Sequence, residues 1–378
     1  MLTFVLAERP TFADVPVQFV DRIIALLPTN LPLASTAHVI DNDSYWKRCA
    51  TERWKNCEVA EHGMSWKRLY FELNLRDALE NFSVSEEEAD LLEIMKLSVN
   101  YIYSLHQRQV LLHYNPQMVL GHCPNLSTLS LRYAQNKVGM EFQWDKFGMT
   151  VLDCTQLANA LKESKSLTYL DLSSNALDDD KIRALVPGML QNKTLISLKL
   201  AHNRISDRGS RAISKVLGES SVLTELDLSD NNLHVLGGKA LGRALKHDRS
   251  LLSLNLRLNR LGDEGGTLLL SGVVDNKILR ELNISANELE TESAKWLNEV
   301  LREHPSLRVL DVSSNKFGEE GGRYIREGLE ANGDVFSVDV RQCNMGEELE
   351  MAVAAAIKDA RGDARKAERK SMMSTVSG

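Results

Sequence analysis

The chain has few of the residues that define several common classes of protein. Its 378 residues include only eight prolines and five cysteines, and aromatic residues make up 6% of the total. The cysteines are odd in number and none falls in a CxxC spacing: Cys49, Cys57, Cys123, Cys154 and Cys343. This usage excludes a disulfide framework and a cysteine zinc site, and it is typical of a reducing compartment.

Long hydrophobic runs and an excess of positive charge are also missing. No apolar run approaches the roughly 18 residues that a membrane span needs, and the N-terminus MLTFVLAERP lacks the basic region and cleavage site of a secretory signal. The net charge is −7, which disfavours nucleic-acid binding through counterion release. We therefore expect no membrane and no nucleic-acid partner. With 43% hydrophobic residues, the chain can still build a large core.

A repeat with a period of 28 residues dominates the second half of the chain. Each unit reads LxxLxLxxNxL, and the first complete unit begins at Leu167. The asparagine recurs without insertion or deletion at Asn175, Asn203, Asn231, Asn259, Asn287 and Asn315. The LxL alternation predicts a short strand, and the helical spacing of Ile182, Leu185 and Met189 predicts a helix in the second half of the unit. Because no unit can bury its apolar face alone, the units must stack. The pattern predicts an α/β leucine-rich-repeat solenoid, a horseshoe like that of ribonuclease inhibitor.

The two ends of the repeat array are irregular. An earlier turn starts at Leu126 but has Ala134 in the asparagine position, and the next unit follows 41 residues later. We infer an insert near 134–155 that is rich in aromatic residues and packs as a flap. The last unit has Cys343 for asparagine and an alanine-rich helix over 351–357, which is typical of a terminal capping repeat.

The region before the repeats is predicted to be helical. An apolar stripe over 20–27 predicts a helix capped by Asp14 and ended by Pro28, and shorter helices are expected over 33–40 and 45–54. A longer helix is expected over 65–79, and a capping box at 85–88 predicts another helix that runs through Leu105. Three tryptophans in this region are interpreted as core residues: Trp46, Trp54 and Trp66. The predicted organisation is a helical, F-box-like region at 1–82, a helical connector at 83–125, the solenoid at 126–362 and a basic tail at 363–378.

No catalytic motif is present. The nine histidines are scattered, and HExxH, GxSxG and GxxxxGK[ST] do not occur. The glycine pairs recur at one phase of the repeat, as in Gly237-Gly238 and Gly265-Gly266, which indicates close helix packing rather than a phosphate loop. Acidic runs such as 178–180 and 319–320 precede predicted helices, where they favour the positive end of the helix dipole. We expect no enzyme activity, no cofactor and no metal.

The strand residues between the buried leucines predict the composition of the concave face. They form a polar, mildly acidic surface with isolated basic residues. Solenoid concavities commonly bind proteins. The candidate partner-binding residues are Tyr169, Asp171, Lys199, Glu225, Asp227, Arg257, Glu281, Asp311, Asp339 and Arg341.

Four stretches together resemble the dynein regulatory complex subunit 5 family, also called the t-complex-associated testis-expressed protein 1 family. They are residues 45–49 with 53–54, residues 62–72, residues 139–144 with 153–154, and residues 255–259 with 263–266. The resemblance implies a non-enzymatic scaffold subunit of the axonemal nexin–dynein regulatory complex, which links outer doublets and regulates dynein-driven sliding and ciliary or flagellar motility. It implies other subunits of that complex as partners, an indirect association with doublet microtubules and dynein, and a location in the axoneme after assembly from the cytoplasm.

Two other readings come from different classes of protein. Residues 15–28 followed by 45–49 resemble a divergent F-box, which would make the chain a substrate adaptor of a cullin ubiquitin ligase. The repeat length is also that of GTPase-activating proteins for the nuclear-transport GTPase. Those proteins carry a strongly acidic C-terminal stretch, whereas residues 358–370 here are basic.

Overall fold

The computed structural model describes residues 12, 15–81, 88–110, 113–133, 148–218, 221–331 and 337–356. The chain divides into two compact units. The first comprises Met1–Lys146 with Glu163–Thr168, and the second comprises Phe147–Lys162 with Tyr169–Gly378.

The first unit is mainly helical. Its elements are α2 (Val17–Leu26), α3 (Leu33–Thr36), α4 (Asp43–Arg53), a 3-10 turn η1 (Val59–His62), α5 (Trp66–Glu80), α6 (Glu88–Ser98), β1 (Ser104–Gln107), α7 (Pro116–His122) and β2 (Thr128–Leu131). Strands β1 and β2 pair in parallel, with Leu105 opposite Leu129. Helix α2 begins after Pro16 without a side-chain cap, and the predicted cap Asp14 lies outside the described residues.

The aromatic cluster of the first unit is centred on Trp46. This side chain is 1% exposed, its indole N–H donates to the carbonyl of Ile40 at 2.9 Å, and its ring lies 5.1 Å from that of Phe71. Trp54 and Trp66 are only partly buried and pack against the core of α4 and α5. The prediction of a core tryptophan is therefore confirmed fully for Trp46 and in part for the other two.

The helix predicted to run through Leu105 is wrong in its extent. Helix α6 ends at Ser98, and Leu105 is a fully buried residue of β1. The carboxylate of Glu72 on α5 accepts the backbone N–H groups of Tyr103 and Ser104, both at 2.8 Å. These donors are therefore satisfied across the fold rather than inside a helix, and β1 adds a strand ahead of the first predicted repeat. The predicted capping box at 85–88 lies outside the described residues except for Glu88.

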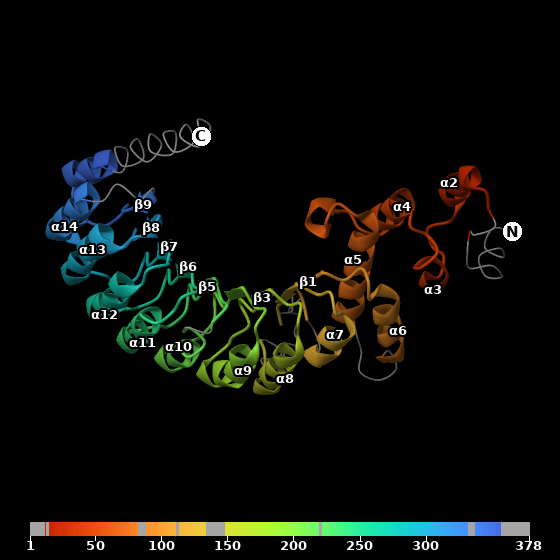
Figure 1. Cartoon of the computed structure of the whole chain (residues 1–378), viewed down its shortest axis with the longest axis horizontal. Coiled ribbons are helices and arrows are strands. Elements are labelled where there is room, and N and C mark those ends of the chain that lie inside the picture. The colour runs from red at the N-terminus through yellow and green to blue at the C-terminus, as the bar shows by residue number, and fades with distance from the viewer. Residues whose placement is uncertain are drawn as a thin grey trace, which may run out of the picture. The chain divides into compact units, whose positions relative to one another are not determined.

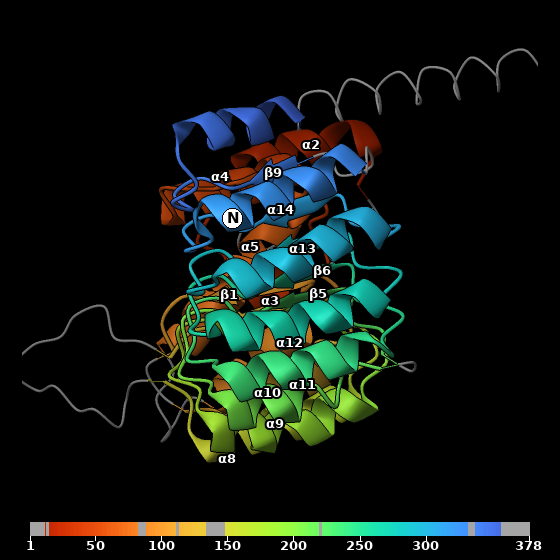
Figure 2. The same ribbon diagram turned by 90° about the vertical axis from the view of Figure 1, so that its left-hand side faces the viewer.

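The second unit alternates strands and helices along the chain. The strands are β3 (Tyr169–Asp171), β4 (Ser197–Lys199), β5 (Glu225–Asp227), β6 (Ser253–Asn255), β7 (Glu281–Asn283), β8 (Val309–Asp311) and β9 (Ser337–Asp339). The helices are α8 (Val151–Glu163), α9 (Asp179–Gln191), α10 (Asp207–Ile213), α11 (Val235–Leu245), α12 (Gly262–Asp275), α13 (Thr291–Glu303) and α14 (Gly318–Ala331). Figure 1 shows the strands on the inner side of this unit and the helices on its outer side, and Figure 2 shows these helices stacked in chain order. The predicted leucine-rich-repeat fold is confirmed.

Strand register in the second unit follows the sequence period. Leu170 lies opposite Leu198, Leu198 opposite Leu226, and the same step of 28 residues continues to Val338. The leucines from β3 to β8 are at most 1% exposed and point toward the helices. Because side chains alternate along a strand, their neighbours must line the opposite face of the sheet.

The asparagine of each repeat joins three segments of backbone. The amide of Asn259 donates to the carbonyls of Leu228 (3.0 Å) and Leu256 (2.9 Å), and its side-chain oxygen accepts the N–H of Leu233 at 3.1 Å. In the last repeat Cys343 occupies this position, and its thiol lies 3.3 Å from the carbonyl of Val312. A thiol is a weaker hydrogen-bond donor than an amide, so this series of asparagine contacts, the asparagine ladder, ends on a weaker contact at Cys343.

The glycine pairs lie where neighbouring helices approach most closely. A Cβ on Gly237 would lie 2.7 Å from a carboxylate oxygen of Asp207, and one on Gly238 would lie 2.5 Å from the carbonyl of Gly265. These glycines therefore serve helix packing.

The irregular ends of the array are only partly described. Residues 134–147 of the predicted insert and residues 357–378, which include the predicted basic tail, lie outside the described residues. Within the described part, α8 already begins at Val151, and Cys154 and Leu157 of this helix are buried. Residues 347–356 are helical, as expected for the final repeat.

Candidate functional site

The inner face of the second unit presents two continuous columns of side chains, fixed by the strand register. One column consists of Tyr169, Ser197, Glu225, Ser253, Glu281, Val309 and Ser337, and the other of Asp171, Lys199, Asp227, Asn255, Asn283, Asp311 and Asp339. The candidate residues that the sequence singled out within the strands therefore do share one face. Arg257 and Arg341 lie just beyond β6 and β9, at the edge of this face.

Charged side chains on this face interact with one another between adjacent strands. The ammonium of Lys199 forms an ion pair with Glu225, whose other oxygen accepts from Ser197 at 2.6 Å. Burial would raise the pKa of Glu225, but the hydrogen bonds from Lys199 and Ser197 outweigh it and lower that pKa. Hydrogen bonds from Arg341 likewise lower the pKa of Asp339. These carboxylates are therefore ionised at neutral pH, and the face keeps its acidic character.

Small residues at the strand ends rigidify part of the face. The hydroxyl of Ser229 donates to Asp227 at 2.7 Å, and that of Ser313 donates to Asp311 at the same distance. The repeat that contains Arg257 differs, because this exposed arginine occupies the position that serine holds in the repeats on either side.

Two further series of side chains accept backbone N–H groups at the 28-residue spacing, and the sequence analysis did not predict them. At the ends of the helices, Asn192, Asp248, Asn276 and His304 each accept backbone N–H groups two and three residues ahead. At the starts of the helices, Asp179, Asp207 and Asp263 each accept N–H groups from the first turn of the next helix. The 28-residue spacing of these positions was a usable signal, but their residue types vary from repeat to repeat.

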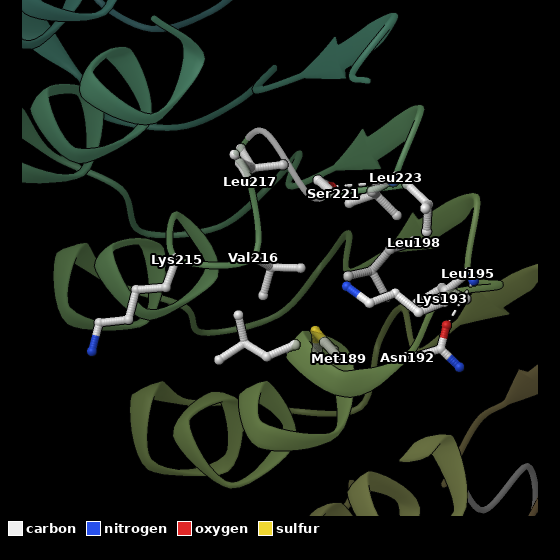
Figure 3. A pocket seen from close by; sticks show the side chains of 13 residues that line it. Met189, Asn192, Lys193, Leu195, Leu198, Lys215, Val216, Leu217, Ser221 and Leu223 are labelled. Carbon is white, nitrogen blue, oxygen red and sulfur yellow. Dashed lines mark hydrogen bonds between the residues drawn. The ribbon is translucent and has the colours of Figure 1, made fainter. Parts of the chain in front are cut away.

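A pocket of about 260 Å³ opens where α10 stops short of its neighbours (Figure 3). Helix α10 ends at Ile213 after 7 residues, whereas α9 has 13. Three successive repeats line the space that results, with Met189 from the first, Leu195 and Val216 from the second and Leu223 from the third. No sequence motif marks this pocket.

Potential metal ligands and nucleophiles are present in the described part of the chain. No group of three or more His, Cys, Asp or Glu side chains is placed to hold a metal ion there. Burial raises the pKa of the Cys123 and Cys154 thiols to about 12, so neither is an activated nucleophile. Among the described helices, none is long and apolar enough to cross a membrane.

The register, the asparagine ladder and the outer layer of helices define the class of this protein as a leucine-rich-repeat solenoid with a helical N-terminal unit. A family model described as Leucine Rich repeat matches residues 163–186, 191–214, 219–242, 247–270 and 303–325.

Similarity to individual proteins gives more specific information than the repeat model does. The chain is 42% identical over 176 residues to a protein of Chlamydomonas reinhardtii named dynein regulatory complex subunit 5, a match that covers 46% of this chain and 45% of that protein. It is 33% identical over 212 residues to the Mus musculus protein of the same name, covering 48% and 43%. The resemblance inferred from the sequence is thus confirmed over the matched residues, and the chain spans less than half the length of these relatives. Among solved structures, leiomodin-1 actin-binding site 2 matches 60% of this chain and 99% of that chain with a TM-score of 0.30 and 13% identity, which is too remote to inform function.

Proposed function

We propose that the chain is a non-enzymatic scaffold subunit of the dynein regulatory complex of motile cilia and flagella. The observation that carries this proposal is the 42% identity to a protein named as a subunit of that complex. In this role the chain belongs to the axonemal link between outer doublets, and it helps to regulate dynein-driven sliding by holding other subunits in place. Its contact with microtubules and dynein is indirect.

The inner face of the second unit is the proposed docking surface. Each strand from β4 to β8 pairs in parallel with a strand on either side, so the backbone of this face is already ordered. Binding of a partner therefore costs little backbone conformational entropy. The carboxylates of Glu225, Asp227, Glu281 and Asp311 lie on three of the four strands from β5 to β8. A partner segment with basic residues at matching intervals complements this surface, and such complementarity fixes register and orientation.

The test is a charge reversal at the two positions of β5 that share the inner face, Glu225→Arg with Asp227→Arg, in a tagged copy expressed in ciliated cells. We expect the variant to lose co-purification with the other regulatory-complex subunits. The matched control is Glu299→Arg with Glu303→Arg, which makes the same change in net charge on exposed positions of α13. Thermal melts of the purified proteins establish that the variants fold. Unchanged capture by a folded strand variant would remove the inner face as the dock.

A second candidate function is a substrate adaptor of a cullin ubiquitin ligase. The observation that favours it is on α2, where Phe19 is 45% exposed and Leu26 is 74% exposed. Exposed apolar side chains on an F-box-like helix are suited to binding another protein. Recovery of a cullin with the wild-type chain, and its loss with Phe19→Asp, would favour the adaptor. Recovery of axonemal subunits without a cullin favours the scaffold.

A further inference from the structure

The turn that follows β6 has a different character from the same turn in every other repeat. At this turn Arg257, Leu258 and Arg260 are all exposed, and Leu258 is 42% exposed. The position of Leu258 is held in the other repeats by Ser174, His202, Asp230, Ala286, Ser314 and Gln342. A large apolar side chain is therefore presented to solvent at a position that is otherwise polar or small.

The backbone conformation makes leucine a poor choice here on grounds of stability. Leu258 has φ of 57°, and the equivalent residues in the other repeats also have positive φ, between 50° and 61°. This left-handed conformation disfavours bulky side chains, whereas asparagine and glycine tolerate it. The conformation is common to all the repeats and is set by the fold, so what points to a functional constraint is the bulky leucine that this one repeat places in it.

The two arginines differ from Lys199 and Arg341, two other cations of this face. Within the described residues, neither Arg257 nor Arg260 forms an ion pair, whereas Lys199 pairs with Glu225 and Arg341 pairs with Asp339. The turn itself is held rigidly. The carbonyl of Arg257 accepts from Asp230 at 2.8 Å, and the N–H of Leu258 donates to Ser285 at 3.0 Å. The three side chains therefore project from a preorganised turn.

We propose that this turn, Arg257–Arg260, is a docking point for an acidic segment of a partner protein that carries an apolar anchor side chain. The guanidinium groups bind carboxylates of the segment, and Leu258 packs against its anchor. The carboxylates of Asp227 and Glu281 on the strands beside β6 repel an extended polyanion, so the site favours a short protein segment over a nucleic acid. This inference rests on the proposed function only in that the edge of the inner face meets a partner.

The experiment measures the fluorescence anisotropy of a short labelled peptide, with a single Glu-Glu-Leu-Glu core, as it binds the full chain at low salt. We expect Arg257→Ala with Arg260→Ala to weaken binding about a hundredfold, because two charge-assisted contacts are lost and each contributes about tenfold. The control is Arg204→Ala, an exposed arginine at the repeat position of Arg260, two repeats earlier. A Glu-Glu-Ser-Glu peptide should bind more weakly, because it lacks the anchor. Equal binding by the double variant or by the serine peptide would overturn the proposal, as would tighter binding of a single-stranded oligonucleotide.

Leu258→Asn separates a binding role from a structural one. Asparagine tolerates the left-handed conformation, so we expect the thermal midpoint to rise while peptide affinity falls. A fall in the thermal midpoint with unchanged affinity would show that Leu258 serves the fold. If the wild-type chain binds no acidic peptide but the strand charge reversal still abolishes co-purification, this inference fails and the proposed function stands.

Discussion

His304 makes the stability of the second unit depend on pH near neutrality. It is 1% exposed and occupies the helix-end position that asparagine holds at Asn192 and Asn276. Its Nδ1 accepts the N–H groups of Ser306 (3.2 Å) and Leu307 (3.0 Å), so the ring must be neutral with its proton on Nε2. Burial, together with the charges of Lys277 and Arg308, lowers the pKa of His304 to about 4.

The sign and size of the effect follow from proton linkage. The unfolded chain binds a proton at His304 below its ordinary pKa of about 6.5, and the folded chain binds one only near pH 4. Stability is therefore complete above pH 6.5 and is lost as pH falls toward 4. Between pH 7 and pH 5 these pKa values give a loss of about 2 kcal/mol.

The perturbation is His304→Asn, which we expect to abolish this loss. Asn276 at the equivalent position accepts the same two N–H groups and donates to the carbonyl of Leu245 at 2.8 Å. The Nε2 of His304 has no hydrogen-bond partner among the described residues, so asparagine also gains a bond at this site.

Urea unfolding followed by circular dichroism at pH 7, 6 and 5 measures the effect. The His304→Asn protein should lose about 2 kcal/mol less than wild type between pH 7 and 5. The exposed His247, changed to asparagine, serves as the control and should leave the wild-type pH dependence intact. An identical loss in wild type and His304→Asn would refute the assignment of the proton to this site.

Three further substitutions each test contacts inside one of the two units. Asn259→Ala removes a buried side chain that satisfies three backbone groups, so it should cost about 2–3 kcal/mol in urea unfolding, whereas exposed Asn232→Ala should be nearly neutral. Gly272→Ala would put a Cβ 1.9 Å from a carbonyl of α11 and should lower the thermal midpoint, while Gly121→Ala meets nothing within 4 Å and should raise it. Glu72→Ala leaves one buried and one partly buried N–H group without their acceptor and should cost about 3 kcal/mol by thermal or urea unfolding; no loss would mean that other groups can replace the carboxylate.

Local pattern was sufficient for the repeats but not for the first unit. The LxL strands and their register follow from the spacing of leucine and asparagine, because each repeat buries the same side chains against the next. The helix predicted through Leu105 failed because its end depends on Glu72, a residue more than thirty positions away whose carboxylate takes the N–H groups of Tyr103 and Ser104.

The sequence by itself determined the solenoid class, the residues of the inner columns, the packing role of the glycine pairs and the resemblance to the regulatory-complex subunits. These features are periodic or contiguous in the chain, so spacing alone exposes them. Only the tertiary structure showed that Arg257 and Arg260 lack ion-pair partners among the described residues, that Leu258 has a left-handed backbone and that His304 is buried at a helix end where other repeats have asparagine or aspartate. These properties depend on what lies next to a side chain in the neighbouring repeat. A single repeat read along the chain does not contain that information.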